Sequence, residues 1–181
     1  MKGTLLALAL TAVFGGLFGS ADDIQVVSLT REGRVWVSFT HAKGMNAEVR
    51  EALRAGLATS ITYDVELRRL VPMWFDQTVA TATVIATAQY DTLTRLYQLS
   101  RTVDGRTDAS KVTGDEEIVR GWLTSSGSER LPLFQTAGLE PNAEYYIKVR
   151  ARTRPRLNWF FFLPLDRGAA TGYTYFTFIP S

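Results

Sequence analysis

The sequence predicts a mainly β domain that folds as a two-sheet antiparallel sandwich with two short helices. Apolar residues recur at every second position in several stretches bounded by turn-forming residues, as in strands that bury one face. In the last third of the chain, a Leu-Glu-Pro turn precedes another alternating stretch, which adds a further predicted strand. The 181 residues include no cysteine, so core packing must stabilise the domain without disulfides.

Residues 1–21 have the layout of a secretory signal peptide. Lys2 supplies a positive charge, an apolar run extends over residues 5–18, and Gly19 and Ala21 occupy the small positions before a cleavage site. An uncleaved membrane anchor is the alternative, but a membrane span needs roughly 17 to 25 residues, whereas this run has 14. We therefore expect residues 22–181 to form a single β-sandwich domain exported to the periplasm or cell envelope.

The first strand is expected at residues 24–29, and the second begins at Val35. Between them, residues 31–34 (Arg-Glu-Gly-Arg) have the composition of a hairpin turn. In the second strand, Val35, Val37 and Phe39 alternate with Trp, Ser and Thr. This period of two predicts that the three side chains share one face of the strand.

The most regular alternation predicts a strand with one buried and one solvated face. Its apolar members Ile61, Tyr63, Val65 and Leu67 alternate with Thr62, Asp64, Glu66 and Arg68. Further strands are expected at residues 78–89, which are rich in Thr, Val and Ala, at 97–103, before an Asp-Gly turn, and at 173–179. We interpret the polar face of the 61–68 strand as a solvated ladder of opposite charges.

Two short helices are expected between the strands. Asn46 can cap the first, whose apolar stripe consists of Val49, Ala52, Leu53 and Leu57. Thr113 and Glu116 have the spacing of a capping box at the start of the second, whose stripe consists of Ile118, Val119, Trp122 and Leu123. Both stripes predict helices that cover an edge or an end of a sheet.

A corner between sheets is indicated by Leu139 and Pro141, which are followed by Tyr145 and then by alternating Ile147 and Val149. This segment resembles the tyrosine corner of fibronectin type III domains. The resemblance implies that Tyr145 has a structural role, with its phenol hydrogen-bonded back to the backbone. It also implies an immunoglobulin- or fibronectin-like sandwich in preference to a closed barrel.

A longer resemblance covers residues 24–179. Its motifs are Glu-Ala-Leu-Arg-Ala-Gly-Leu at 51–57, the alternating strand at 61–69, Trp-Phe-Asp at 74–76 and Tyr-Asp-Thr-Leu-Thr-Arg-Leu-Tyr at 90–97. Together they resemble a bacterial family of exported proteins described as domain of unknown function 4390. The resemblance implies an exported, sheet-rich domain and carries no known activity.

The charge balance argues against nucleic acid as a partner. The chain has 20 Lys and Arg against 18 Asp and Glu, a net charge of +2, which becomes +1 if Lys2 leaves with the signal segment. Nucleic-acid-binding domains concentrate positive charge on one face. We therefore expect no nucleic-acid partner, and the composition does not determine the oligomeric state.

Few residues suit catalysis or cofactor binding. His41 is the only histidine, so a metal site would depend on carboxylates around one imidazole, and a Ser-His-acid triad would have to use this residue. At the end of a strand it is interpreted as a surface residue. We expect no catalytic residue, no cofactor and no metal site.

Carboxylates leave one enzymatic alternative open. Five of them lie close together in the sequence: Asp104, Asp108, Asp115, Glu116 and Glu117. They surround a turn and a helix start, where acidic residues are expected for capping. A hydrolase that uses two carboxylates as acid and base is the alternative.

The candidate interaction surface combines a basic stripe with an aromatic run. Alternation in an extended strand would place Arg150, Arg152, Arg154 and Arg156 on one side, and Pro155 should confine this part to an edge or an exit. The aromatic run that follows consists of Trp159, Phe160, Phe161 and Phe162. The two together suit a protein interface or an anionic membrane surface, although the aromatics could instead close one end of the sandwich.

These observations predict an exported binding or accessory module of the cell envelope that is not an enzyme. Its expected partner is another envelope protein. The alternatives are a peripheral membrane-associating protein, which would use the 159–162 loop and the Arg stripe, and the carboxylate hydrolase.

Overall fold

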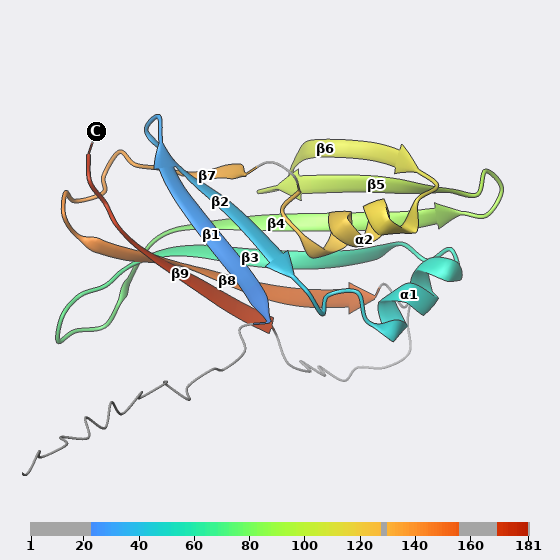
Figure 1. Ribbon diagram of the computed structural model, residues 1–181, viewed down its shortest axis with the longest axis horizontal. Coiled ribbons are helices and arrows are strands. Elements are labelled where there is room, and N and C mark those ends of the chain that lie inside the picture. Colours follow the sequence, from blue (N-terminus) through green and yellow to red (C-terminus); the bar gives the residue numbers. More distant parts are fainter. Residues whose placement is uncertain (1–22, 128–129, 156–169, 181) are drawn as a thin grey trace, which may run out of the picture.

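Antiparallel strands dominate the structure, a computed structural model that describes residues 23–127, 130–155 and 170–180. Within these residues the strands form two sheets, and two helices lie at their borders (Figure 1). The small sheet has the order β1 (Ile24–Arg31), β2 (Arg34–His41), β7 (Leu131–Gln135). The predicted mainly β, sandwich-like fold is confirmed.

The large sheet carries the remaining strands. Its order is β6 (Arg106–Thr113), β5 (Leu96–Val103), β4 (Gln77–Asp91), β3 (Thr59–Arg69), β8 (Glu144–Pro155) and β9 (Ala170–Thr177). Every paired neighbour is antiparallel. β4 and β3 therefore lie at the centre of the sheet, where both of their edges are hydrogen-bonded.

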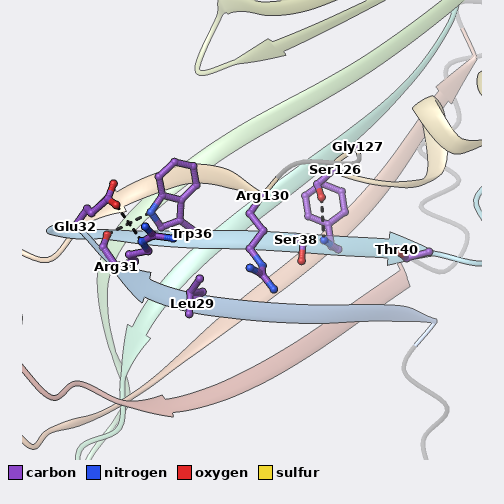
Figure 2. A pocket seen from close by; sticks show the side chains of 10 residues that line it. Leu29, Arg31, Glu32, Trp36, Ser38, Thr40, Ser126, Gly127 and Arg130 are labelled. Atoms are coloured by element: carbon purple, nitrogen blue, oxygen red, sulfur yellow. Dashed lines mark hydrogen bonds and ion pairs between the residues drawn. The ribbon is translucent and has the colours of Figure 1, made fainter.

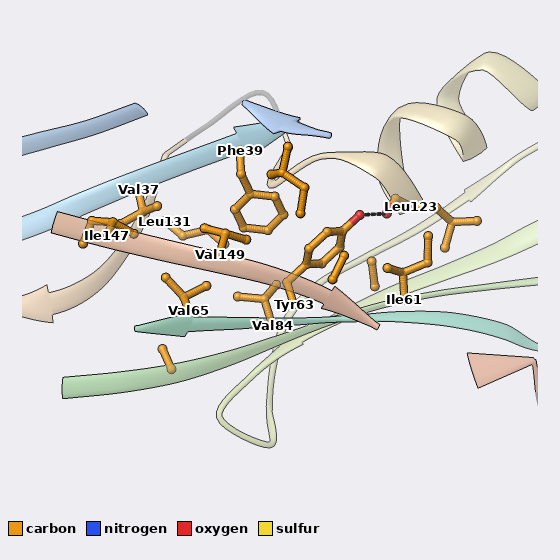
Figure 3. Packing of buried hydrophobic residues seen from close by; sticks show 14 of the residues in the cluster. Val37, Phe39, Ile61, Tyr63, Val65, Val84, Leu123, Leu131, Ile147 and Val149 are labelled. Atoms are coloured by element: carbon orange, nitrogen blue, oxygen red, sulfur yellow. Dashed lines mark hydrogen bonds between the residues drawn. The ribbon is translucent and has the colours of Figure 1, made fainter. Parts of the chain in front are cut away.

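The apolar residues of the predicted alternation form the centre of the core. All four apolar residues of the 61–67 alternation are completely buried on β3, and Val35 and Val37 are buried on β2. Between the sheets, the rings of Phe39 and Tyr63 lie next to each other (Figure 3), with their centroids 4.5 Å apart. The Tyr63 hydroxyl donates a 2.7 Å hydrogen bond to the backbone oxygen of Leu123, which ties the second helix to the centre of the large sheet.

The hairpin turn predicted at residues 31–34 is confirmed, and the Asp-Gly turn predicted to close the 97–103 strand is a second hairpin turn, which leads into β6. Arg31 pairs with Arg34, and the residues between them, Glu32 and Gly33, have φ angles of 53° and 71°. The turn after β5 repeats this pattern at Asp104 and Gly105. Two successive positive φ angles match the twist of an antiparallel hairpin.

Helix α1 (Ala47–Arg54) has the predicted cap, because the Asn46 side chain accepts a hydrogen bond from the Val49 backbone N–H at 2.9 Å. Val49 and Leu53 face the core. The prediction for Leu57 is wrong: the helix ends before Gly56, whose φ is 76°, and Leu57 is exposed.

Helix α2 (Glu116–Thr124) exists, but its predicted cap is wrong. Asp115 is the N-cap and accepts a 2.8 Å hydrogen bond from the Glu117 backbone N–H. Thr113 is the last residue of β6, paired with Tyr97, and its hydroxyl accepts a hydrogen bond from the Asp115 backbone N–H. The β ladder therefore holds Thr113 outside the helix.

The sequence did not predict β6 or β7. β6 is almost entirely exposed and polar, so it lacks the apolar alternation of a half-buried strand. β7 has five residues and contains Pro132. A short edge strand with a proline resembles a loop in sequence.

The corner residue Tyr145 is buried, and its hydroxyl accepts a 2.8 Å hydrogen bond from the backbone N–H of Glu140. Its ring stacks on Phe176 of β9 with the centroids 5.8 Å apart. The hydrogen bond to the upstream backbone thus has the form implied by a tyrosine corner. A wider likeness to fibronectin type III domains stays a prediction.

Candidate functional site

Three of the four most exposed large hydrophobic side chains among the described residues lie at the end of the β3–β4 hairpin. Met73, Trp74 and Phe75 keep 101%, 77% and 86% of their surface, and we call them the hairpin tip. The local chain turns because Met73 adopts a φ of 62° and the Trp74 backbone N–H donates to the Val71 oxygen at 3.1 Å.

The end of this loop that follows the tip is fixed to the sheet by two hydrogen bonds to Asp76. Asp76, directly after the tip, accepts a 3.0 Å hydrogen bond from the Tyr146 hydroxyl of β8. The Arg68 guanidinium donates to the Asp76 backbone oxygen at 3.0 Å and lies 5.9 Å from the centre of the Tyr146 ring. The hairpin tip is therefore held in place by its base.

A tyrosine cluster continues from the tip across the outer face of the large sheet. Tyr146 lies 5.4 Å from Tyr175 and 6.3 Å from Tyr173, measured between ring centroids. Tyr146 is buried among these groups, whereas Tyr173 and Tyr175 are exposed. Burial raises the pKa of the Tyr146 phenol, and its hydrogen bond to Asp76 raises it further, so the phenol remains a donor at neutral pH.

The charges beside the hairpin tip are paired. Arg69 holds the Glu140 carboxylate with two guanidinium nitrogens, and Arg68 lies 3.6 Å from Glu66. The region therefore combines exposed apolar and aromatic groups with balanced charge.

The structure describes only part of the predicted basic stripe. Arg150 and Arg152 lie on the outer face of β8, and Arg152 donates to the Asp64 carboxylate of β3 at 2.7 Å. Arg154 pairs with Ser60 in the β ladder, and Pro155 is the last residue of β8. Arg156 and the aromatic run at 159–162 lie outside the described residues.

The interpretation of His41 as a surface residue is wrong. It is 7% exposed and lies edge-on to Tyr63, with 6.3 Å between the ring centroids. Burial lowers the pKa of its imidazole, an effect that the Asp23 carboxylate partly offsets. Gly44 provides room for the ring, since a Cβ there would lie 2.7 Å from Nδ1.

Several of the clustered carboxylates make local structural contacts. Asp104 accepts from the Thr83 backbone N–H at 2.7 Å, Asp115 caps α2, and Glu117 pairs with Arg120. Across the described residues, no three His, Asp or Glu side chains are grouped as metal ligands.

Two hollows flank the small sheet. The first, of about 740 Å³, lies over the outer face of β1 and β2 and includes Leu29, Trp36 and Arg130, as Figure 2 shows. The second, of about 760 Å³, shares Trp36, Gly127 and Arg130 with the first. The two hollows therefore adjoin along β2. Neither includes the hairpin tip.

The comparison with known families matches residues 20–156 to a family described as Domain of unknown function (DUF4390). The chain belongs to the DUF4390 family. The matched residues run from before β1 to the end of β8, so the small sheet and the hairpin tip fall inside the match, whereas β9 of the large sheet lies beyond it. No curated protein and no solved structure matches the chain.

The sequence resemblance included Trp74 and Phe75 without assigning them to an interaction surface. A sequence feature that could have indicated an exposed contact surface is the apolar run at positions 72–75. It lies in a turn between two alternating strands, where polar residues are usual. In the part of the DUF4390 chain that the structure describes, no helix has the length and apolar character needed to cross a bilayer.

Proposed function

We propose that the chain is a non-catalytic binding or accessory module of the cell envelope whose hairpin tip docks into an apolar pocket of a partner protein. The observation that carries this proposal is the exposure of Met73, Trp74 and Phe75 at the end of a fixed hairpin. Exposed apolar groups of this size mark contact surfaces.

The fixed base favours tight docking. Arg68 and Tyr146 hold both sides of Asp76, so little backbone order has to be gained when the tip binds. Preorganisation lowers the entropic cost of association. Burying each tip side chain would contribute about 1.5–3 kcal/mol.

Charge and composition favour a protein over a lipid surface. An anionic membrane attracts unpaired Lys and Arg, whereas Arg68 and Arg69, the cations of β3 nearest the tip, lie against Glu66 and Glu140. Trp, Phe, Met and Tyr are enriched in protein interfaces. The tip and the adjacent tyrosine cluster supply all four.

The location in the cell envelope is supported by residues 1–21, with their positive start, apolar run and small residues before Asp22. The non-catalytic assignment is supported by the structural contacts of Asp104, Asp115 and Glu117.

The test places a photo-reactive phenylalanine analogue at Trp74 in cells that express the full chain. The matched control places the same analogue at Leu93, which is 92% exposed in a different turn. We expect one protein to crosslink from position 74 and not from position 93. The purified partner should then bind the chain, with at least about tenfold weaker affinity for the Trp74→Ser/Phe75→Ser variant.

Equal crosslinking from both positions, or none from position 74, would overturn the proposal. Binding of the chain to anionic vesicles that is lost in the same double variant would replace the protein partner with a membrane surface. A second variant with Ser at Trp159, Phe160, Phe161 and Phe162 tests the aromatic run predicted from the sequence. If only this second variant loses the partner, the 159–162 loop and not the hairpin tip is the docking element.

A further inference from the structure

The second hollow exists because the large sheet extends beyond the small one. β7 is the last strand of the small sheet, and within the described residues β2 is its only ladder partner. Beyond its free edge, β5 and β6 continue the inner face of the large sheet. Helix α2 covers part of that face, with Leu123 buried and Trp122 half-buried.

The groove between β7, β6 and α2 has walls of three kinds. Arg101 and Lys111 come from the large sheet, Trp122 from α2, and Leu131 and Pro132 from β7. This places a hollow of about 760 Å³ beside a strand edge, in the position that a fourth strand of the small sheet would occupy. An extended chain can add to such an edge through its backbone hydrogen bonds.

Arg101 makes this groove more than an apolar gap. Its side chain is 5% exposed, its Nη1 donates to the Ser126 backbone oxygen, and its guanidinium carbon lies 4.6 Å from the centre of the Trp122 ring. Nε and Nη2 are buried and have no hydrogen-bond partner among the described residues. Burying donors of a charged group without acceptors costs free energy. A ligand acceptor that reached these two nitrogens would recover that free energy on binding.

The surroundings keep positive charge near this position. Lys111 and Arg130 line the same groove, with Asp108 as the opposing charge. Burial lowers the pKa of Arg101, and the Asp108 carboxylate partly offsets that effect. Gly127 allows the guanidinium to lie under the chain, because a Cβ there would be 2.6 Å from Nη1. Three cations against one carboxylate complement an anionic ligand.

We propose that this groove binds an extended peptide segment of a partner, which adds to the free edge of β7 and places one carboxylate on Arg101. Leu131, Pro132 and the Trp122 ring would contact the apolar side chains that flank this carboxylate. The ligand is thus an acidic strand with apolar neighbours. This site shares no residue with the hairpin tip and does not depend on it.

The experiment selects short random peptides, displayed on phage, against the purified protein. We expect the enriched peptides to carry Asp or Glu between alternating β-branched or aromatic residues. A synthetic copy of one such peptide should bind about tenfold more tightly than its Asn or Gln counterpart. The variant Arg101→Gln should bind the acidic peptide about tenfold more weakly than the unchanged protein does. It should bind the acidic peptide and its Asn or Gln counterpart equally.

Backbone pairing is tested with two further copies of the peptide, N-methylated at alternate amides. Addition to a single strand edge uses every second amide, so one copy should lose binding and the other should retain it. Equal binding of both copies would overturn the strand addition. Equal binding of short aliphatic acids such as hexanoate would assign the groove to free acids and overturn the peptide ligand.

Arg101→Gln could prevent folding, because the side chain is buried. The exposed residues Lys111 and Arg130 provide a second test, since their change to Gln should weaken acidic peptides and not neutral ones. Arg50→Gln, on the exposed side of α1, is the matched control and should leave affinity unchanged.

Selected peptides that show no preference for acidic residues would contradict the proposal, as would an affinity that none of the three groove variants changes. Trp74→Ser should not affect this binding, which separates failure of the groove from failure of the hairpin tip.

Discussion

Buried titratable side chains are the residues in which this structure departs most from a simple apolar core. His41 lies at the end of β2 against Tyr63, and Arg101 lies under Gly127. Both have buried nitrogens without a hydrogen-bond partner in the described chain. The protonation of His41 is therefore coupled to folding.

Stability is expected to fall in mild acid because of His41. Burial lowers the pKa of its imidazole in the folded state below the ordinary value of 6.5. Between the lowered pKa and about 6.5 the unfolded chain binds a proton that the folded chain does not. The free energy of unfolding should therefore decrease as the pH falls through this window, as measured by urea denaturation at several pH values.

The variant His41→Gln isolates this contribution, because it removes the imidazole and keeps a polar side chain. Its free energy of unfolding should change less between neutral pH and mild acid than that of the unchanged protein. Parallel pH profiles for the two proteins would show that His41 does not titrate differently on folding.

At the scale of elements, close approach of β1 to β9 joins the two sheets on the side opposite the groove. Gly172 of β9 lies directly against the backbone of Ile24, where a Cβ would come 2.0 Å from the Ile24 oxygen and 2.8 Å from its carbonyl carbon. Backbone atoms cannot move aside as the end of a flexible side chain can. A glycine is therefore required by the packing of two strands and not by its φ angle.

The variant Gly172→Ala should destabilise the fold by about 1–3 kcal/mol, since overpacking forces the strands apart. Equilibrium unfolding in urea measures the change. The matched control is Gly121→Ala in helix α2, where a Cβ would meet nothing within 4 Å. That variant should stabilise the protein by about 0.5–1 kcal/mol. Equal stability of Gly172→Ala and the unchanged protein would contradict the close approach.

Strand edges also explain why some elements were predictable and others were not. β3 lies inside the large sheet with its inner face in the core, so each second residue had to be apolar. β6 pairs only with β5 among the described residues and has a register shift opposite Arg101 and Thr102. An exposed edge strand with a bulge and charged residues is protected against aggregation. Because its residues are polar on both faces, the sequence of such a strand lacks the apolar alternation by which strands are predicted.

At the scale of the whole molecule, one core connects both sheets and both helices. Buried residues from β1, β2, β3, β4, β5, β7 and β8 form a single cluster, together with Val49 of α1 and Leu123 of α2. A shared core predicts that the two sheets unfold together and not separately.

The core and the surface should respond differently to the same truncation. Leu67→Ala, at a fully buried position, should cost about 2–5 kcal/mol. Leu93→Ala, at a position that is 92% exposed, should change the free energy of unfolding by less than about 0.5 kcal/mol. Far-ultraviolet and near-ultraviolet circular dichroism should give one coincident urea transition in each case. Separate transitions would show that the sheets are independent.

The sequence by itself determined the fold class, the inner faces of β2 and β3, the hairpin turn at 31–34, the turn that ends β5, the first helix cap and the family. Each of these depends on interactions within a few residues: alternation along a strand, the φ angles of a turn, or a side chain that reaches the next backbone N–H. Local rules of this kind can be read along the chain.

The features that depend on contacts between distant parts of the chain were decided only by the tertiary structure. Burial of His41 depends on Tyr63, the fixed hairpin tip depends on Tyr146 of β8, and the groove depends on where the small sheet ends above β5 and β6. In the sequence, Trp74 is one of 21 Trp, Tyr and Phe residues, and Arg101 is one of 20 Lys and Arg residues. Exposure of the first and burial of the second follow from the meeting of segments that are far apart in the chain, which no local pattern encodes.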